Sequence, residues 1–259
     1  MSYMAAISIS DLTVRFGEVL AVDNASIDIA DGEFVSIVGP SGCGKTTILN
    51  LLTGLVPLTQ GTISLLGKTP VVGNPDVAYM LARDSLLPWR SALDNASYGM
   101  EIRGVDEATR HNKARALLAQ VGLKGFEQHY PKMLSHGMRQ RCALARTFCL
   151  DSPVMLMDEP FGALDAQTKL QLEDLLLRLW SEHRRTVVFI THDLAEAVAL
   201  SDRVIVMSAR PGRIIADMRI PLERPRSVRA LQKDRHFLDI YAEVWSKLEE
   251  GLGNVEAVL

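Results

Sequence analysis

A glycine-rich segment near the start of the chain carries residues whose types and spacing suit phosphate chemistry. It matches the pattern G-x-x-x-x-G-K-[ST], with Gly39, Gly44, Lys45 and Thr46 at the fixed positions. An apolar, strand-like run precedes it and a helix-like segment follows it, which is the context in which this pattern binds phosphate. Glycine allows positive φ values, so successive backbone N–H groups converge on phosphate oxygens, and the helix start adds unpaired N–H groups of its own. The segment therefore predicts a nucleotide-binding loop.

The positions of this loop have distinct predicted roles. Lys45 is expected to reach the β- and γ-phosphates of the nucleotide, and the Thr46 hydroxyl to ligate Mg²⁺. A chance match is the competing interpretation, but with Gly at ~7% of average usage the four fixed positions coincide in only about one such chain in a hundred. The predicted nucleotide-contacting residues of the loop are Gly39, Pro40, Ser41, Gly42, Cys43, Gly44, Lys45, Thr46 and Thr47.

Two adjacent carboxylates end a second apolar run. Asp158 and Glu159 follow the strand-like residues 154–157, and ligands of open α/β sheets bind at the carboxyl ends of the strands. Asp158 is predicted to hold Mg²⁺ directly or through water. Glu159 is predicted to polarise the water that attacks the γ-phosphorus. Exposed acidic pairs are common, so these assignments depend on the phosphate loop in the same chain.

Two further positions are ambiguous from the residues alone. Phe16 precedes Gly17 at the tip of a hairpin-like unit, and it is either a core aromatic or a surface on which an adenine ring stacks. Ser135, followed by Gly137, opens a predicted helix. Its side chain and the free N–H groups of that helix start form either a second anion site or an ordinary helix cap.

Composition narrows the class of protein. Lys and Arg total 28 against 31 Asp and Glu in 259 residues, so no basic excess points to a nucleic-acid partner. The three cysteines, Cys43, Cys142 and Cys149, have neither metal-ligand spacing nor a plausible disulfide framework. We find no pattern typical of a signal peptide and no apolar run near the ~18 residues of a membrane span. A cytoplasmic protein is expected, with docking on a membrane protein left open.

Hydrophobic periodicity divides the chain into a strand-rich core and a helical insert. Alternating apolar residues at 7–16 and 20–29 predict two antiparallel strands with one exposed face. Further strands are expected at 33–38, 61–66, 77–81, 154–157, 186–190, 204–207 and 213–218, and helices at 46–52, 91–103, 106–121, 137–149, 166–183, 194–200 and 227–250. The predicted organisation is an ATP-binding domain at 1–220, whose core of 1–85 and 151–220 is split by a helical insert at 86–150, followed by a short helical C-terminal extension at 221–259.

The motifs together resemble the ATP-binding cassette (ABC) family over about residues 7–218. The phosphate loop is followed by Leu134-Ser-His-Gly-Met-Arg-Gln-Arg141, Met157-Asp-Glu-Pro160, Gly162-Ala-Leu-Asp165 and Thr191-His-Asp193, in the order of that family. The resemblance implies an α/β fold: a P-loop NTPase (RecA-like) core with an antiparallel β subdomain and an inserted α-helical subdomain. It also implies ATP hydrolysis, with ATP and Mg²⁺ as the bound ligands.

The resemblance implies roles for residues outside the phosphate loop. Ser135 and Gly137 would contact the γ-phosphate of ATP held by the other subunit of a homodimer. His192 would steady the γ-phosphate and the attacking water, the alternative being a buried structural histidine. Asp165 would link the two sites across the dimer, and Phe16 would stack on adenine.

A subtype is also indicated. The segment Leu86-Leu-Pro-Trp-Arg90 and the exact forms of the later motifs look like ATPase subunits of importers for nitrate, aliphatic sulfonates, taurine and similar solutes. Such subunits would bind two transmembrane permease subunits at the inner face of the cell membrane, and a periplasmic or lipoprotein solute-binding protein indirectly. Trp89 is then a permease contact, or else a core residue. The rival hypotheses are a poorly hydrolysing regulatory dimerisation module and a soluble ABC ATPase that acts on DNA or the ribosome.

The chain departs from the family pattern at two positions. Ala82 stands where the family has a glutamine that contacts Mg²⁺ and water, and we expect nearby Asp84 to substitute for it in part. His136 lies in the segment Leu134–Arg141, which corresponds to the signature motif of the family, and it stands where that motif has its first glycine. Its side chain would either crowd the approaching phosphate or, as a cationic imidazole, help to bind it.

Overall fold

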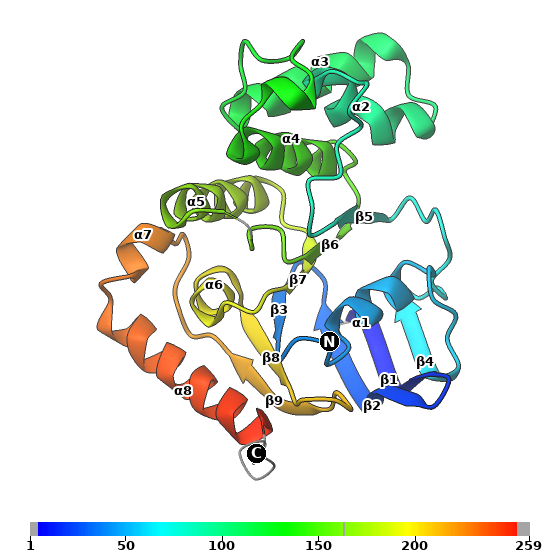
Figure 1. Cartoon of the computed structure of the whole chain (residues 1–259), viewed down its shortest axis with the longest axis vertical. Coiled ribbons are helices and arrows are strands. Elements are labelled where there is room, and N and C mark those ends of the chain that lie inside the picture. The colour runs from blue at the N-terminus through cyan, green and yellow to red at the C-terminus, as the bar shows by residue number, and fades with distance from the viewer. Residues whose placement is uncertain (1–4, 163, 253–259) are drawn as a thin grey trace.

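Two β-sheets form the body of the molecule (Figure 1), which the computed structural model describes for residues 5–162 and 164–252. The smaller sheet is antiparallel and has the strand order β2-β1-β4. Its strands are β1 (Ala5–Phe16), β2 (Val19–Ala30) and β4 (Gln60–Leu65). The alternation of apolar and polar residues in β1 and β2 puts one face of this sheet in the core, as predicted.

The larger sheet has the strand order β5-β6-β7-β3-β8-β9, and only β9 is antiparallel to its neighbour among the described strands. Its strands are β5 (Val77–Met80), β6 (Val154–Asp158), β7 (Thr186–Ile190), β3 (Phe34–Val38), β8 (Arg203–Met207) and β9 (Ile214–Arg219). Every residue of β3, β6 and β7 is buried, because both faces of a parallel sheet are covered.

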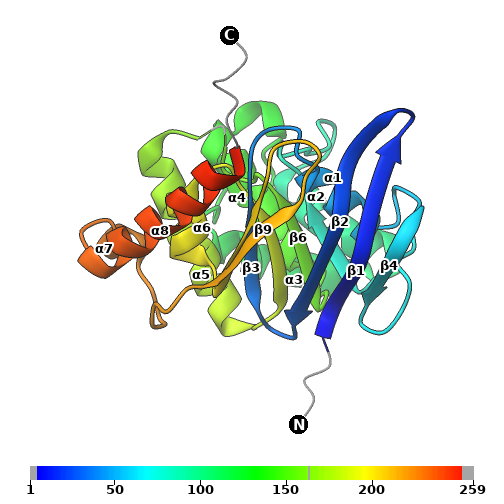
Figure 2. The ribbon, with the colours of Figure 1, turned by 90° about the horizontal axis from the view of Figure 1, so that it is seen from below.

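The two faces of this sheet belong to different apolar clusters. On β3, Phe34 and Val38 pack toward α5 (Ala166–Glu182) and α6 (Leu194–Leu200), whereas Val35 and Ile37 pack toward α1 (Lys45–Leu52) and the smaller sheet. Figure 2 shows the smaller sheet and α6 on opposite sides of the larger sheet. Successive side chains of a strand point to opposite faces of the sheet. The larger sheet is therefore the middle one of three layers, with α5 and α6 on one face and α1 and the smaller sheet on the other.

Three helices are inserted between β5 and β6, as the sequence predicts. They are α2 (Ala92–Ile102), α3 (Glu107–Gln120) and α4 (His136–Phe148), and they form the upper group in Figure 1. Leu144 and Phe148 of α4 belong to the same apolar cluster as Met155 of β6. The insert is therefore packed onto the core rather than tethered to it.

The described part of the C-terminal extension, up to residue 252, contains two helices where one was expected. The short helix α7 (Val228–Leu231) is separated from α8 (Arg235–Leu252) by a turn. Asp234 causes the break, because its Oδ1 atom accepts hydrogen bonds from the N–H groups of His236 (2.8 Å) and Phe237 (3.2 Å) and so caps α8. Residues 253–259 of the predicted extension lie outside the described residues.

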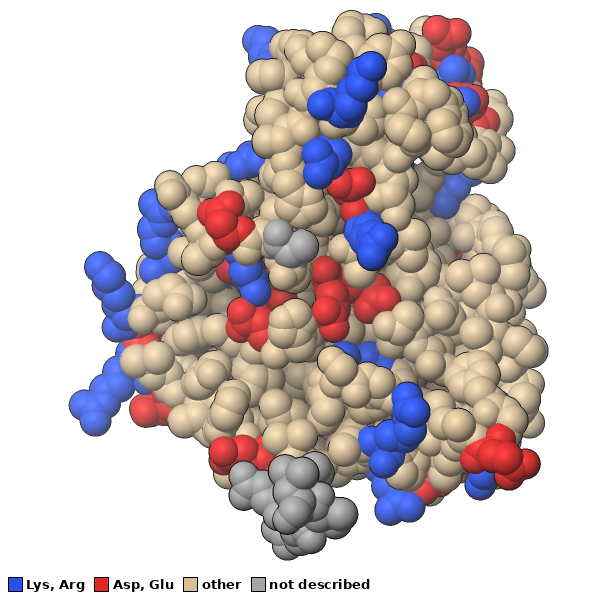
Figure 3. Space-filling view, viewed as in Figure 1, with Lys and Arg blue, Asp and Glu red and all other residues tan. Residues whose placement is uncertain are grey.

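The surface carries both signs of charge, as the near balance of acidic and basic residues predicts. Acidic and basic side chains are interspersed over the face drawn in Figure 3. Within the described residues, no helix is both long enough and apolar enough to cross a bilayer.

Candidate nucleotide-binding site

The phosphate loop connects β3 to α1 at the carboxyl edge of the larger sheet. Gly44, with φ of 106°, directly precedes Lys45, the first residue of α1. A Cβ atom on Gly44 would lie 2.6 Å from Cγ2 of Val22, and one on Gly39 would lie 2.8 Å from the carbonyl oxygen of Met207. Both contacts are shorter than real Cβ atoms make. Glycine is therefore needed here both for its backbone angles and for the close approach of neighbouring strands.

The Lys45 ammonium lies within the curve of this loop. Its Nζ atom donates to the carbonyl oxygens of Gly39 (2.8 Å) and Pro40 (3.0 Å), and the residue is only 6% exposed. Two backbone oxygens thus compensate a nearly buried cation, as such a charge requires. The loop holds this positive charge beside the N-terminus of α1, where the helix dipole also favours an anion.

A cavity of about 250 Å³ opens beside the loop. Its wall is formed by Phe16, Val19, Ala21, Ser41, Gly42, Gly44, Lys45, Thr46, Thr47, Glu159 and Arg210. Phe16 is 49% exposed, so the alternative that it is a core aromatic is wrong. Of the predicted loop contacts, Gly39, Pro40 and Cys43 do not line the cavity. Gly39 and Cys43 are buried beneath it.

Thr46 and Asp158, the two predicted metal ligands, are in direct contact. The Thr46 hydroxyl lies 3.0 Å from Oδ2 and 3.2 Å from Oδ1 of Asp158. Asp158 is 7% exposed, and burial, with the neighbouring charge of Glu159, raises its pKa above the usual value. Burial and the charge of Asp158 also raise the pKa of Tyr79 to about 12. A buried anion with oxygen donors on two elements is the environment that a Mg²⁺ ion suits.

The rest of the metal's coordination must come from elsewhere. No group of three or more His, Cys, Asp or Glu side chains that could hold a metal occurs in residues 5–162 and 164–252. Mg²⁺ commonly uses one or two protein oxygens together with substrate phosphates and water. The Thr46–Asp158 pair therefore fits a metal that arrives with a nucleotide.

Glu159 and His192 form a second polar pair at the same sheet edge. Nδ1 of His192 lies 3.0 Å from Oε2 of Glu159. Glu159 has a left-handed φ of 44°, and its N–H donates to the carbonyl oxygen of Ile190 at 2.9 Å. A non-glycine residue in this region costs about 1–3 kcal/mol and is typical of functional sites. The His192 side chain is 58% exposed, so the alternative of a buried structural histidine is wrong.

A buried charge network supports the loop that carries His192. The neighbouring Asp193 caps α6, and its Oδ2 accepts a hydrogen bond from Nζ of Lys169 in α5 at 2.7 Å. Lys169 also lies 3.4 Å from Oε1 of Glu196. Burial, and then the charge of Glu196, raises the pKa of Glu173 to about 8. Lys169 thus joins the helix that begins after Asp165 to the turn that holds His192.

The residues implied for the second subunit lie away from the cavity. Ser135 caps the 13-residue helix α4, where its Oγ accepts the N–H of Met138 at 3.2 Å. Asp165 caps α5 in the same manner through the N–H of Thr168 at 3.0 Å, and a hydrogen bond with the Thr168 side chain, and then this backbone bond, lower the pKa of Asp165. Both are exposed. Neither they nor Gly137 belongs to the described wall of the cavity in the same chain.

Residues at or near both departures from the family pattern contact Arg139. Oδ2 of Asp84 accepts a hydrogen bond from Nε of Arg139 in α4 at 2.9 Å, so its charge is paired with the insert. The expected substitution of Asp84 for a metal-contacting glutamine at Ala82 stays a prediction. His136 Nδ1 lies 3.2 Å from Nη2 of Arg139. A guanidinium only donates, so Nδ1 of the imidazole accepts this hydrogen bond.

Three cavity residues, Val19, Ala21 and Arg210, were missed by the sequence reasoning, and only Arg210 among them is charged. Arg210, in the loop between β8 and β9, lines the cavity and donates from Nε to the carbonyl oxygen of Gly42 at 3.2 Å. It lies 168 positions from Gly42 in the chain. A cluster of basic residues after β8 was the available signal, but its spacing carries no motif.

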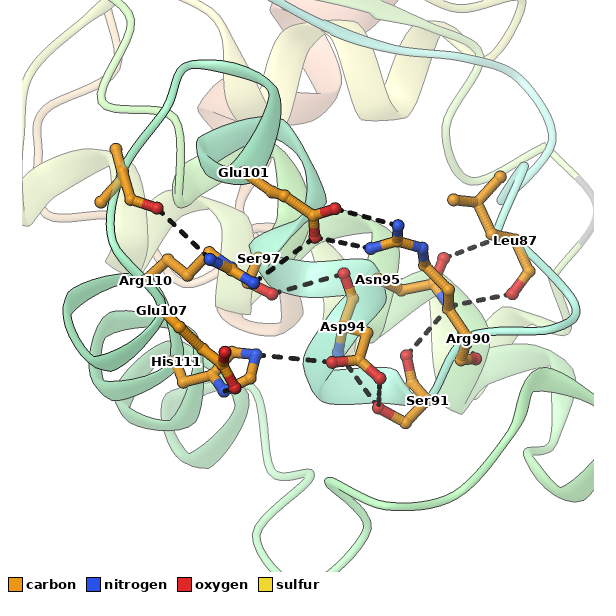
Figure 4. A network of polar contacts seen from close by, with 11 residues as sticks. Leu87, Arg90, Ser91, Asp94, Asn95, Ser97, Glu101, Glu107, Arg110 and His111 are labelled. Atoms are coloured by element: carbon orange, nitrogen blue, oxygen red, sulfur yellow. Dashed lines mark hydrogen bonds and ion pairs between the residues drawn. The ribbon is translucent and has the colours of Figure 1, made fainter.

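The segment before α2 is held firmly while its tryptophan is exposed. Buried Asn95 donates to the carbonyl oxygens of Leu87 (3.1 Å) and Arg90 (3.0 Å), and it accepts the N–H of Leu87 at 2.7 Å. Arg90 makes a two-pronged ion pair with Glu101 (Figure 4) at 2.7 and 3.0 Å. Trp89 between them is 72% exposed, so the alternative that it is a core residue is wrong.

Comparison with known proteins agrees with this geometry. The family described as "ABC transporter" matches residues 22–162. The putative ATP-binding protein BAB2_1147 of Brucella abortus (strain 2308) is 45% identical over 240 residues, which is 92% of this chain and 92% of that protein. The taurine import ATP-binding protein TauB of Escherichia coli (strain K12) is 38% identical over 250 residues, which is 94% of this chain and 97% of TauB.

Solved structures lead to the same family. The dimeric post-hydrolysis state of the ATP-binding cassette MJ0796, bound to ADP and Pi, superposes with a TM-score of 0.72 and 29% identity over 84% of this chain and 100% of that one. The fold and the family predicted from the motifs are confirmed. Because the cavity, the phosphate loop and the similarity over nearly the whole chain agree, the chain belongs to the ABC transporter family and is one of its ATP-hydrolysing subunits.

Proposed function

We propose that this subunit powers the import of a small solute, with nitrate, aliphatic sulfonates and taurine as the candidate class. The observation that carries the energetic half of this proposal is the Glu159–His192 pair at the edge of the nucleotide cavity. The solute class is supported by relatives such as TauB, whose name states taurine import. The regulatory and soluble alternatives are not favoured by these similarities.

The proposed chemistry is hydrolysis of the γ-phosphate. Glu159 accepts a proton from the attacking water, the water oxygen bonds to the γ-phosphorus, and the bond to ADP breaks. His192, oriented by its contact with Glu159, steadies the γ-phosphate. Lys45 and the loop N–H groups hold the β- and γ-phosphates, and Phe16 stacks on adenine. Thr46 and Asp158 would hold Mg²⁺, which when bound neutralises charge on the phosphates.

We further propose that two copies sandwich two ATP molecules. Ser135 and Gly137 begin a helix whose exposed N-terminus suits a phosphate, yet they lie apart from the cavity of their own chain. A second copy would bring its Ser135 and Gly137 to that cavity, with Asp165 at the contact between copies. The related cassette MJ0796 has been solved as a dimer, which supports this arrangement.

The proposed membrane partners are two permease subunits, bound at the inner face of the cell membrane, with a periplasmic or lipoprotein solute-binding protein as an indirect partner. Trp89 suits such a contact because it is a large, exposed aromatic on a rigid framework. Rigid aromatic side chains give much binding energy for little loss of conformational freedom.

Phosphate release by purified protein with ATP and Mg²⁺ tests the enzymatic part, and the Glu159→Gln variant tests the site. That variant should release phosphate about 10²–10⁴-fold more slowly, the range of general-base help, while ATP converts it from monomer to dimer in size-exclusion chromatography. Parental turnover would contradict the role of Glu159, and a monomer at saturating ATP would contradict the sandwich. If a solute-binding protein is encoded beside this chain, its binding of candidate solutes tests the solute class.

A further inference from the structure

One arginine ties both neighbours of Ser135 to the segment that follows β5. The Nη1 atom of Arg139 donates to the carbonyl oxygen of Leu134 at 2.9 Å, and Nη2 donates to Nδ1 of His136 at 3.2 Å. The third nitrogen, Nε, donates to Oδ2 of Asp84 at 2.9 Å. Each nitrogen of the guanidinium therefore donates a hydrogen bond. Two of these bonds go to the neighbours of Ser135, and the third goes to a residue 55 positions earlier in the chain.

The segment that contains Asp84 is attached to α4 at further points. Arg146, two turns along α4, donates to the carbonyl oxygens of Asp84 (2.7 Å) and Ser85 (2.8 Å). Oδ1 of Asp84 accepts the N–H of Leu86 at 3.3 Å. Ser85 has a left-handed φ of 46°. The carboxylate is thus fixed in direction by its own segment and by α4, so a shift of this segment acts on Arg139.

One departure from the family pattern, His136, contacts this guanidinium, and the other, Ala82, stands two positions before Asp84, which also contacts it. With glycine at position 136, Arg139 would have no imidazole to hold, and at Ala82 the methyl side chain has no oxygen to offer. A link therefore joins Asp84 to His136 through Arg139. The link uses the fork geometry of arginine, because three acceptors lie in three directions around one planar group.

We propose that Arg139 is a positioning residue that carries movements of residues 82–86 to Ser135. Its hydrogen bonds to Leu134 and His136 fix the direction of the helix start that lies between them. The ion pair with Asp84 fixes the position of the Arg139 side chain. This inference rests on the proposed contact of Ser135 with ATP held by the other copy. The residues that line the cavity of the same chain do not take part in the link.

The test is a double-mutant cycle on the full-length protein. Asp84→Asn and Arg139→Lys should each lower kcat about tenfold, the loss of one charge-assisted hydrogen bond. Lysine keeps the charge, but its single nitrogen lacks the planar fork that reaches the three separated acceptors. The double variant should lose no more than the larger single loss, because both changes break one link. Asp84→Glu should restore most of kcat.

Asp217→Asn is the matched control. Asp217 forms a similar part-exposed ion pair with Arg203 in β8, away from the insert. Its loss should lower the melting temperature without changing kcat, whereas a fall of kcat in this control as large as in Asp84→Asn would overturn the proposal. Independent, additive losses in the double variant would also overturn it. So would a higher Mg²⁺ requirement for Asp84→Asn alone, since that result assigns Asp84 to the metal.

The Glu159→Gln background separates this inference from the proposed function. If ATP does not dimerise Glu159→Gln itself, the sandwich fails and the inference fails with it. If ATP dimerises the Glu159→Gln protein, adding Arg139→Lys should raise the ATP concentration needed for dimerisation about tenfold, because the same charge-assisted hydrogen bond is lost. Equal dimerisation with and without Arg139→Lys, together with parental kcat for Arg139→Lys alone, would overturn the inference and leave the proposed function standing.

Discussion

Nδ1 of His192 lies 3.0 Å from Oε2 of Glu159. The carboxylate accepts, so Nδ1 carries the hydrogen and Nε2 is left free of this contact. The two side chains come from the ends of neighbouring strands, β6 and β7. The N–H of Glu159 is hydrogen-bonded to the carbonyl oxygen of Ile190. Strand pairing thus determines how Glu159, the proposed base, and His192 meet.

His192→Ala should lower kcat about 10²-fold, at the lower end of acid–base assistance, because the γ-phosphate loses the group that steadies it during the reaction. The KM for ATP should change little, since His192 is not part of the described cavity wall. Its exposed side chain makes the expected change in stability smaller than about 0.5 kcal/mol. Phosphate release and a thermal melt measure both quantities, and unchanged kcat would contradict the assignment.

Asp158→Asn should abolish Mg²⁺-dependent turnover yet stabilise the protein in EDTA. Burial raises the pKa of Asp158, so its ionised form costs folding free energy at neutral pH when no cation compensates it. A neutral amide removes that cost, and each kcal/mol gained raises Tm by about 2–4 °C in a domain of this size. Differential scanning fluorimetry checks the sign. A lower Tm in EDTA would show that the Thr46 hydrogen bond outweighs the buried charge.

Stability should fall as pH rises through the range in which Glu173 ionises. Burial, and then the charge of Glu196, raises the pKa of Glu173 to about 8 in the folded chain, against an ordinary value of 4.5. The folded state therefore binds more protons than the unfolded state between these values. The stabilisation is complete below pH 4.5 and is lost as pH approaches about 8.

Glu173→Gln should flatten this dependence, because the amide does not titrate. Urea denaturation at several pH values between 5 and 8 gives the slope of the unfolding free energy. Glu182→Gln, at the exposed end of the same helix, is the control and should keep the parental slope. Equal slopes for all three proteins would rule out Glu173 as the source.

Phe16→Ala should raise the KM for ATP about 5- to 150-fold, because stacking of a base on an aromatic ring contributes about 1–3 kcal/mol. The residue is half exposed, so Tm should hardly change. Phe16→Trp should keep a parental KM, since it retains a flat ring. Nucleotide binding measured by fluorescence gives the same comparison without turnover, and equal affinities for Ala and Phe would exclude stacking.

The local motifs were readable from the sequence because their physics is local. Positive φ values at Gly44, the apolar run of β6 before Asp158, and the cap at Ser135 depend on residues a few positions apart. Such spacing repeats wherever the same chemistry is needed. The strands, the helical insert and the phosphate loop were therefore predicted with boundaries close to those found.

Partners across the fold were decided only by the tertiary structure. Asp84 pairs with Arg139 across 55 positions, and Arg210 reaches Gly42 across 168 positions. Sheet order and the packing of the insert bring these residues together, and no spacing in the sequence encodes either. The exposure of a side chain is also decided by the tertiary structure. Phe16 and Trp89 are apolar aromatic residues that could equally belong to a core, and only the packing of the layers leaves their rings on the surface.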